Sequence, residues 1–203
     1  VAVMDTPVPN AFATGRSPKH AAVCVTTGLW ERLEPREVEG VLAHELSHIA
    51  NRDVLIMTVA SFFAMLAALL TRFGLYGGMF SGGRDRDSGP PVWLIIFAVS
   101  ILTYLLSYIL IRTISRYREY AADRGAAVIT GAPEYLMSAL QKISSQMSLI
   151  PNRDLRAVEG MNAFFIIPAG VKNAAGELFA SHPPIEKRLA ALAEIAREMG
   201  RPV

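Results

Sequence analysis

The sequence predicts a mainly α-helical protein with a small β-hairpin, an α+β fold in which a two-helix transmembrane hairpin interrupts a water-exposed domain. Three observations support this: two long uncharged apolar runs in mid-chain, short β-branched segments before them, and helical patterns on either side. The expected division is an N-terminal half over residues 1–53, a membrane hairpin over 54–111 and a C-terminal half over 112–203.

The composition points to a membrane protein. Of 203 residues, 52% are hydrophobic and 19% are charged, and the mean hydropathy is +0.32. A net charge of +2 is not the strongly basic balance typical of nucleic-acid-binding domains, so we expect no nucleic-acid partner. The single cysteine, Cys24, cannot form an internal disulfide and is expected to fill the core. The chain begins at Val1 without an initiator Met, and we expect it to be a fragment of a longer protein.

The N-terminal region is expected to form strands and turns. Residues 10–15 alternate weakly and end at a glycine, and residues 20–27 are rich in β-branched and apolar side chains. Joined through residues 16–19, these two segments predict a hairpin. A short helix is expected over residues 29–33.

Two uncharged runs, Val54 to Thr71 and Pro90 to Ile111, are each near the roughly 20 residues that span a bilayer. The alternative is a pair of buried helices in a soluble core. The connection over residues 72–90 is Gly-rich and charged, and predicts an exposed loop. Both outer ends of such a hairpin emerge on one side, and the arginines beside them favour the cytoplasm for that side.

The motif H-E-x-x-H, at His44, Glu45 and His48, follows Pro35, which suits a first helical position. Residues four apart lie on one face of a helix, so both imidazoles can hold one zinc ion while Glu45 stands beside them to take a proton from water. The alternative is two histidines and a glutamate on the wet face of an amphipathic helix. We expect this helix to end near Asp53.

A catalytic zinc needs a third protein ligand. His20, His182 and the carboxylates are the candidates. Glu119 lies about 10 Å along a helix beyond the second span, and His48 about 9 Å before the first, so the two would reach a similar height if both helices continued straight. Asp123 shares the face of Glu119 and could accept the N–H of a liganding histidine. The alternative is a solvated face whose carboxylates pair with nearby arginines.

The C-terminal region predicts further helices over residues 112–125, 133–147 and 184–199, with irregular chain over 148–180. His182 stands immediately before the last helix, a poor place for core packing. One interpretation is a surface histidine that caps a helix. Arg188 could anchor Asp123 or a substrate carbonyl.

Three ordered motifs, H-E-L-S-H-I-A-N-R-D, R-E-Y-A-A-D and S-H-P-P-I-E-K-R-L, together with the apolar pair, resemble the HtpX family of membrane zinc metallopeptidases. The match runs from Pro9–Gly15 to near the C-terminus. More distantly the chain is similar to the CAAX prenyl endopeptidases of the same clan.

The resemblance implies a zincin-like (gluzincin) fold and one zinc ion per chain. It places the zinc ligands on His44, His48 and Glu119, the base on Glu45, and the carboxylate that supports a ligand on Asp123. It also puts His182 beside the metal, where we expect it to donate to a developing oxyanion or to gate the zinc. It also implies a substrate-binding strand at Asn10, Ala11 and Phe12, with a plain structural strand as the alternative.

The function implied is a zinc endopeptidase of the inner (plasma) membrane, multi-pass, with its site on the cytoplasmic side, acting on misfolded or damaged membrane proteins in quality control and stress response. The alternatives are a CAAX-type prenyl-protein endopeptidase, a non-catalytic zinc-stabilised membrane scaffold and a soluble metal-binding module. Nothing in the sequence indicates an oligomeric state.

Overall fold

The computed structural model describes residues 1–80, 92–147 and 182–201. The chain divides into two compact units. Unit 1 combines Val1–Leu55 with Ser115–Val203, and unit 2 is Ile56–Ile114. The expected irregular chain over 148–180, and most of the expected loop over 72–90, lie outside the described residues.

Unit 1 contains a three-stranded sheet with the order β1-β3-β2. The antiparallel pair β2 (Ala11–Ser17) and β3 (His20–Thr26) forms the predicted hairpin, with Phe12 opposite Cys24. Gly15 adopts φ +134° where the register shifts, and a Cβ atom there would meet the backbone of residues 20 and 21. The parallel strand β1 (Ala2–Met4) was not predicted, because three residues carry no readable alternation.

The helix α2 (Pro35–Ala50) carries the histidine motif, and its start is fixed by its sequence. Pro35 occupies the first turn, and the Glu37 carboxylate accepts the backbone N–H of Glu34 at 2.8 Å. A short helix, α1 (Thr27–Trp30), precedes it, capped by the Thr26 hydroxyl.

The end of α2 differs from a straight continuation into the first apolar run. The helix stops at Ala50, Arg52 takes the left-handed conformation with φ 56°, and α3 begins at Asp53. The comparison of heights along two straight helices therefore rested on a premise that the structure does not meet. Neither Gly nor Pro marks this boundary between α2 and α3 in the sequence. We infer that tertiary packing sets its position.

The core of unit 1 lies between α2, the sheet, α5 (Pro133–Met147) and α8 (Ile185–Glu198). Gly40 of α2 lets the two helices approach closely, because a Cβ atom there would lie 3.0 Å from the backbone nitrogen of Leu136 in α5. The buried apolar centre includes Val25, Leu29, Val41, Leu136, Leu140 and Leu192.

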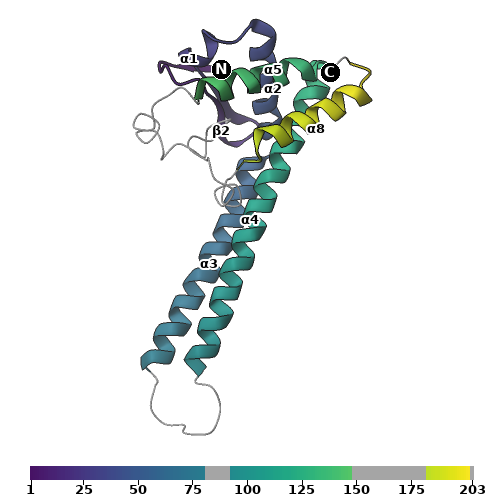
Figure 1. The fold of residues 1–203 in the computed structure, drawn as a ribbon. Coiled ribbons are helices and arrows are strands. Elements are labelled where there is room, and N and C mark those ends of the chain that lie inside the picture. The colour runs from purple at the N-terminus through teal and green to yellow at the C-terminus, as the bar shows by residue number, and fades with distance from the viewer. Residues whose placement is uncertain (81–91, 148–181, 202–203) are drawn as a thin grey trace. The chain divides into compact units, whose positions relative to one another are not determined.

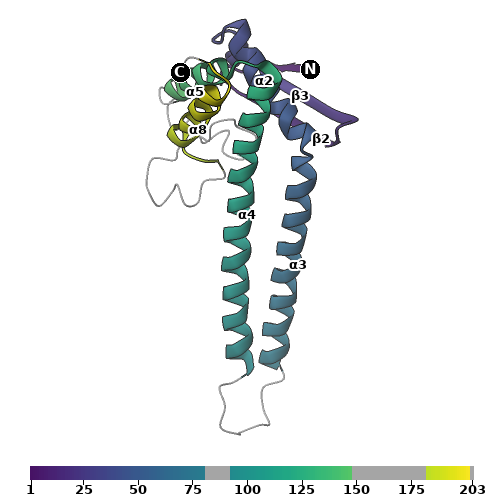
Figure 2. The same ribbon diagram turned by 90° about the vertical axis from the view of Figure 1, so that its right-hand side faces the viewer.

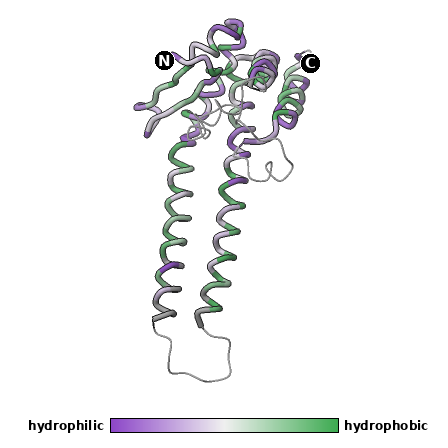
Figure 3. Tube along the Cα trace, turned by 60° about the vertical axis from the view of Figure 1, so that its left-hand side comes forward, coloured by the Kyte–Doolittle hydropathy of each residue, from purple (hydrophilic) through white to green (hydrophobic). Residues whose placement is uncertain are grey.

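Two helices are long and apolar enough to cross a membrane. They are α3 (Asp53–Phe80) and α4 (Val92–Thr130), and within unit 2 they run side by side (Figures 1 and 2). Figure 3 shows that apolar residues dominate both. The helix α3 extends to Phe80, so the predicted loop begins later than residue 72. The predicted helix ending at or slightly beyond Gly125 is the end of α4, at Thr130.

Candidate metal centre

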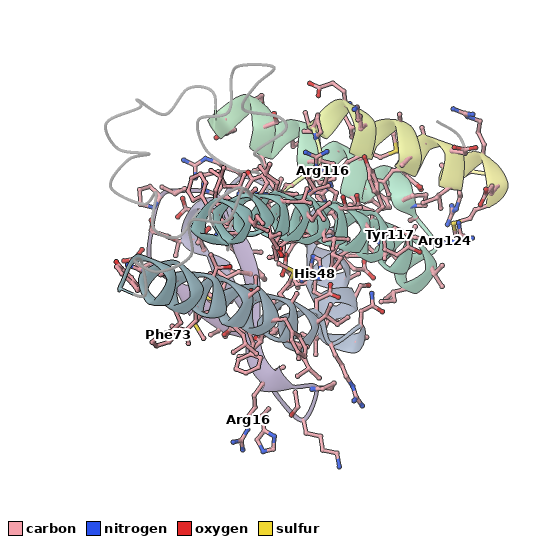
Figure 4. All side chains as sticks on the ribbon, turned by 90° about the horizontal axis from the view of Figure 1, so that it is seen from below. Arg16, His48, Phe73, Arg116, Tyr117 and Arg124 are labelled. Carbon is pink, nitrogen blue, oxygen red and sulfur yellow. The ribbon has the colours of Figure 1, made fainter. Side chains whose placement is uncertain are left out.

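The structure brings the two histidines of α2 together. Their Nε2 atoms lie 3.1 Å apart, and the His44 side chain is 1% exposed. The four-residue spacing stacks one imidazole a turn above the other, with ring centroids 4.6 Å apart. Figure 4 labels His48 among the side chains of α2.

Glu119 of α4 supplies a third donor group. Its Oε1 lies 3.5 Å from His48 Nε2 and its Oε2 lies 3.7 Å from His44 Nε2. Ligand atoms of these three residues all lie within 4.8 Å of one another. Three donors on a tetrahedral metal ion with bonds near 2.0–2.1 Å would stand about 3.3 Å apart, so the separations between these three groups suit one ion.

The opposite nitrogen of each ring faces a carboxylate. His44 Nδ1 lies 2.9 Å from Asp123 Oδ1, and His48 Nδ1 lies 2.5 Å from Asp53 Oδ2. A carboxylate favours a proton on Nδ1, which leaves lone pairs on the two Nε2 atoms that face each other. Glu119 Oε2 is buried without a well-oriented hydrogen-bond donor among the described residues. A cation between these atoms satisfies all three, so the residues fit a metal ion.

Arg188 of α8 supports Asp123 from behind. Its Nε and NH2 atoms donate to the two carboxylate oxygens at 2.9 and 2.6 Å, and both side chains are buried. Burial opposes ionisation of Asp123, but the guanidinium and the His44 ring hold the pKa of that carboxyl below its usual value. The sequence-based expectation that Arg188 could anchor Asp123 agrees with this contact.

In the absence of a metal ion, a proton on the imidazole of His44 supplies positive charge beside the buried carboxylates. Burial favours the neutral imidazole of His44, but the carboxylates of Asp123 and Glu119 outweigh burial and raise its pKa to about 9. Burial likewise opposes ionisation of Glu119, yet His182 and His44 hold the pKa of that carboxyl well below its usual value. The centre therefore attracts positive charge.

Glu45 lies next to His44 on α2 and is 5% exposed. Burial raises the pKa of its carboxyl, partly offset by the two imidazoles and by the backbone N–H of Ala13. A carboxyl with a raised pKa beside the candidate metal position has the properties of a general base. The contact with Ala13 brings strand β2 to the same place.

His182 precedes α8 and places Nδ1 3.1 Å from Glu119 Oε2. Its side chain is 11% exposed, so it is no freely solvated cap. His20, the other candidate ligand, lies away from the centre: it is exposed at the start of β3, beside the Ser17 hydroxyl.

The expected substrate strand is only partly accessible. Asn10 and Ala11 are 3% and 1% exposed, and the backbone of Asn10 is occupied by Thr26. Phe12 is half-buried, as is Ala13.

Two residues of the centre were not predicted. Asp53 was expected only near the end of the histidine helix, and Arg118 only among the arginines beside the second apolar run. Arg118 Nε lies 3.0 Å from Asp53 Oδ1, and Asp53 is 2% exposed. The signal that could have found Asp53 was an acidic residue five positions after His48. On a continuous helix that spacing would not bring the two side chains together, but a turn between them does.

A cavity of about 390 Å³ lies elsewhere on α2. Its lining is mostly apolar, and none of the three donor residues contributes to it. It includes Leu33, Val38, Leu42 and Leu46.

Two histidines and a glutamate disposed in this way are characteristic of metallopeptidases, and known proteins place the chain in that class. A model of Peptidase family M48 matches residues 1–196. The chain belongs to this family and is a metallo-endopeptidase.

Particular relatives point to the protease HtpX. The chain is 56% identical over 200 residues to the "Protease HtpX homolog" of Moorella thermoacetica, covering 98% of this chain and 67% of that protein. It is 53% identical over 199 residues to "Protease HtpX homolog 2" of Methanosarcina acetivorans, again covering 98% and 67%. These matches confirm the predicted resemblance to the HtpX family.

A solved structure supports the fold. The crystal structure of S. mikatae Ste24p matches with a TM-score of 0.57 and 22% identity, covering 94% of this chain and 44% of that one. The predicted fold class, mainly helical with a small sheet and an apolar helix pair, is confirmed.

Proposed function

We propose that the chain is a membrane-embedded zinc endopeptidase whose metal ligands are His44, His48 and Glu119. The observation that carries this proposal is the convergence of three donor groups, within 4.8 Å of one another, beside the buried carboxyl of Glu45. Zinc suits a set of two imidazoles and one carboxylate that leaves a position open for water or substrate.

A zinc ion held there would supply a Lewis acid that polarises the scissile carbonyl and makes water more acidic. Glu45 takes the proton from the attacking water and gives it to the leaving amine, which its raised pKa allows. Asp123 and Arg188 keep the His44 ring turned toward the centre. His182 is placed beside Glu119, from where it can donate to the oxyanion of the tetrahedral intermediate.

The substrate is proposed to be an extended peptide that pairs with the outer edge of β2. In the described sheet β2 is an edge strand, and its backbone at Ala13 lies close enough to Glu45 to influence the pKa of that carboxyl. Because Asn10 and Ala11 are buried, the segment from Phe12 to Thr14 is the more accessible part of the predicted substrate strand.

Membrane embedding follows from α3 and α4, whose apolar segments have mean hydropathies of 2.4 and 1.8. The arginines that flank the two spans favour the cytoplasm for the side bearing the site, in an inner (plasma) membrane. A site tethered beside a bilayer suits membrane proteins as substrates, and the resemblance of the three motifs to the HtpX family is the ground for proposing misfolded or damaged ones. The prenyl-protein endopeptidase and the non-catalytic scaffold are less supported.

The test compares two glutamates that the proposal gives different roles. Glu45→Gln should lower casein hydrolysis by the purified, detergent-solubilised chain by about 10²–10⁴-fold while about one zinc per chain remains bound. Glu119→Gln should lose zinc as well as activity. The matched control is Glu39→Gln, an exposed position on α2, the helix that carries Glu45. This variant should behave as wild type. Equal zinc content in the wild type and Glu119→Gln would refute the ligand assignment.

A further inference from the structure

Each of the two histidines is backed by an acid and an arginine. Behind His44 stand Asp123 and Arg188, both buried. Behind His48 stand Asp53 and Arg118, with side chains 2% and 18% exposed. Neither Asp53 nor Arg118 was expected beside His48, although they lie in the motifs H-E-L-S-H-I-A-N-R-D and R-E-Y-A-A-D.

The carboxylate of Asp53 divides its two oxygens between two neighbours. Oδ2 lies 2.5 Å from His48 Nδ1, and Oδ1 lies 3.0 Å from Arg118 Nε. The contact of Arg118 with Oδ1 is an ion pair without the orientation of a hydrogen bond, and it leaves Oδ2 to face the ring. An oxygen facing Nδ1 requires the proton to be on Nδ1, which frees the Nε2 lone pair.

We propose that Asp53 is a positioning residue that fixes the tautomer and orientation of His48, and that Arg118 fixes which atom of residue 53 faces the ring. The proposal rests on the proposed metal centre. It assigns a function to the turn at Arg52 (φ 56°), because that turn brings residue 53 back to a histidine five positions earlier.

The Asp53→Asn variant distinguishes a positioning role toward His48 from a structural role as a helix cap. Asn caps a helix start about as well as Asp, so loss of a cap would be small. However, Arg118 would attract the amide oxygen of the asparagine and turn its NH2 group toward His48 Nδ1. That donor favours a bare Nδ1 and therefore a proton on Nε2, which a metal ion must displace, so metal binding is weakened.

The experiment uses the full chain in detergent, labelled with ¹⁵N-histidine. In the metal-free protein, at a pH where imidazole is neutral, the ring-nitrogen shifts of His48 report its tautomer. Asp53→Asn should move the proton from Nδ1 to Nε2 and weaken zinc binding by about 10–100-fold in competition with a chromophoric chelator. Asn51→Ser, at an exposed position in the same turn, is the matched control and should leave both unchanged.

The double variant Asp53→Asn/Arg118→Met decides the role of the arginine. Without the guanidinium the amide can turn its oxygen to the ring, so the Nδ1 proton and part of the zinc affinity should return. Wild-type zinc affinity in Asp53→Asn, an unchanged tautomer, or no recovery in the double variant would each overturn the proposal. Since the tautomer is measured without metal or substrate, a failure here is distinct from a wild-type chain that binds no zinc or cleaves nothing.

Discussion

At the scale of single residues, a proton on His44 and a bound metal ion compete for one buried, negatively charged place. The pKa of His44 is raised to about 9, above the ordinary value of 6.5, because Asp123 and Glu119 outweigh the effect of burial. Between about pH 6.5 and pH 9, His44 binds a proton in the metal-free folded state but not in the unfolded state. A metal ion must displace this proton before it can bind Nε2.

The raised pKa of His44 makes the stability of the metal-free chain depend on pH. In the metal-free chain the stabilisation from His44 is fully present below about pH 6.5 and is lost as the pH rises to about 9. Thermal unfolding of the metal-free protein should therefore show a falling melting temperature across this window. Zinc affinity should rise over the same window, by up to about tenfold per pH unit for the one proton released.

The control for this prediction is His44→Gln, which removes the titrating ring. Its metal-free form should lose most of the slope in melting temperature between the two pH values. A slope equal to that of the wild type would assign the linkage to another group, of which Glu45 is the nearest, since burial raises its pKa too.

At the scale of elements, the contact between α4 and α8 depends on a buried ion pair. Arg188 binds Asp123 through two hydrogen bonds, and neither side chain is exposed to solvent. Removing one partner leaves a buried charge without its counter-charge, whereas replacing both by apolar groups of similar size avoids that cost.

We therefore predict that Arg188→Met lowers the free energy of unfolding by about 3–5 kcal/mol. The double variant Asp123→Leu/Arg188→Met should recover much of that stability, as measured by denaturant unfolding in detergent. Zinc affinity should stay low in both variants, because the His44 ring has lost its carboxylate or the support of that carboxylate. Recovery of zinc affinity together with stability would show that the pair only holds the helices together.

The approach of α4 to α2 depends on Gly125. A Cβ atom at this position would lie 2.4 Å from the Ser47 hydroxyl oxygen and 2.9 Å from its Cβ. Rotation of the hydroxyl cannot relieve the second contact, so the helices must separate. Glu119 and Asp123 lie on the same helix, and a shift of α4 would move them relative to the histidines.

Gly125→Ala should therefore destabilise the chain by about 1–3 kcal/mol, although alanine favours helices. It should also weaken zinc binding. Adding Ser47→Ala removes the nearer clash and should restore part of both quantities. Val128→Ala, at an exposed position on the same helix, is the control and should change neither. An undiminished zinc affinity in Gly125→Ala would contradict this account.

Most elements could be predicted because their signals are local. Apolar periodicity, Pro35 and Pro133 as helix starts, and the uncharged runs each act within a few residues. Spacing on α2 predicted the proximity of His44 and His48 for the same reason. The contact between Glu119 and these rings needed the family motif as well, because it joins distant parts of the sequence.

The elements that escaped prediction depend on tertiary packing. The strand β1 forms only because β3 offers a parallel edge. The turn at Arg52 carries no Gly or Pro, so its left-handed backbone could not be foreseen. Asp53 and Arg118 meet only after that turn has formed, and for this reason the support of His48 was missed.

At the scale of the whole molecule, the two apolar helices decide where the chain resides. Large side chains of α3 and α4 remain exposed in unit 2, among them Phe62, Phe63, Leu102 and Leu105. Bare apolar surface of this extent needs a partner other than water. We expect the expressed chain to stay with the membrane pellet after an alkaline carbonate wash and to be released by detergent. Release by carbonate alone would contradict a spanning hairpin.

Unit 1 is assembled from two stretches of sequence that unit 2 separates. The ribosome therefore makes His44 and His48 first, then the whole apolar hairpin, and only afterwards Glu119. Under the proposed ligand set, a nascent chain has no complete centre until the hairpin has been synthesised. Any translation product that stops before residue 119 would lack the third proposed metal ligand and would be inactive.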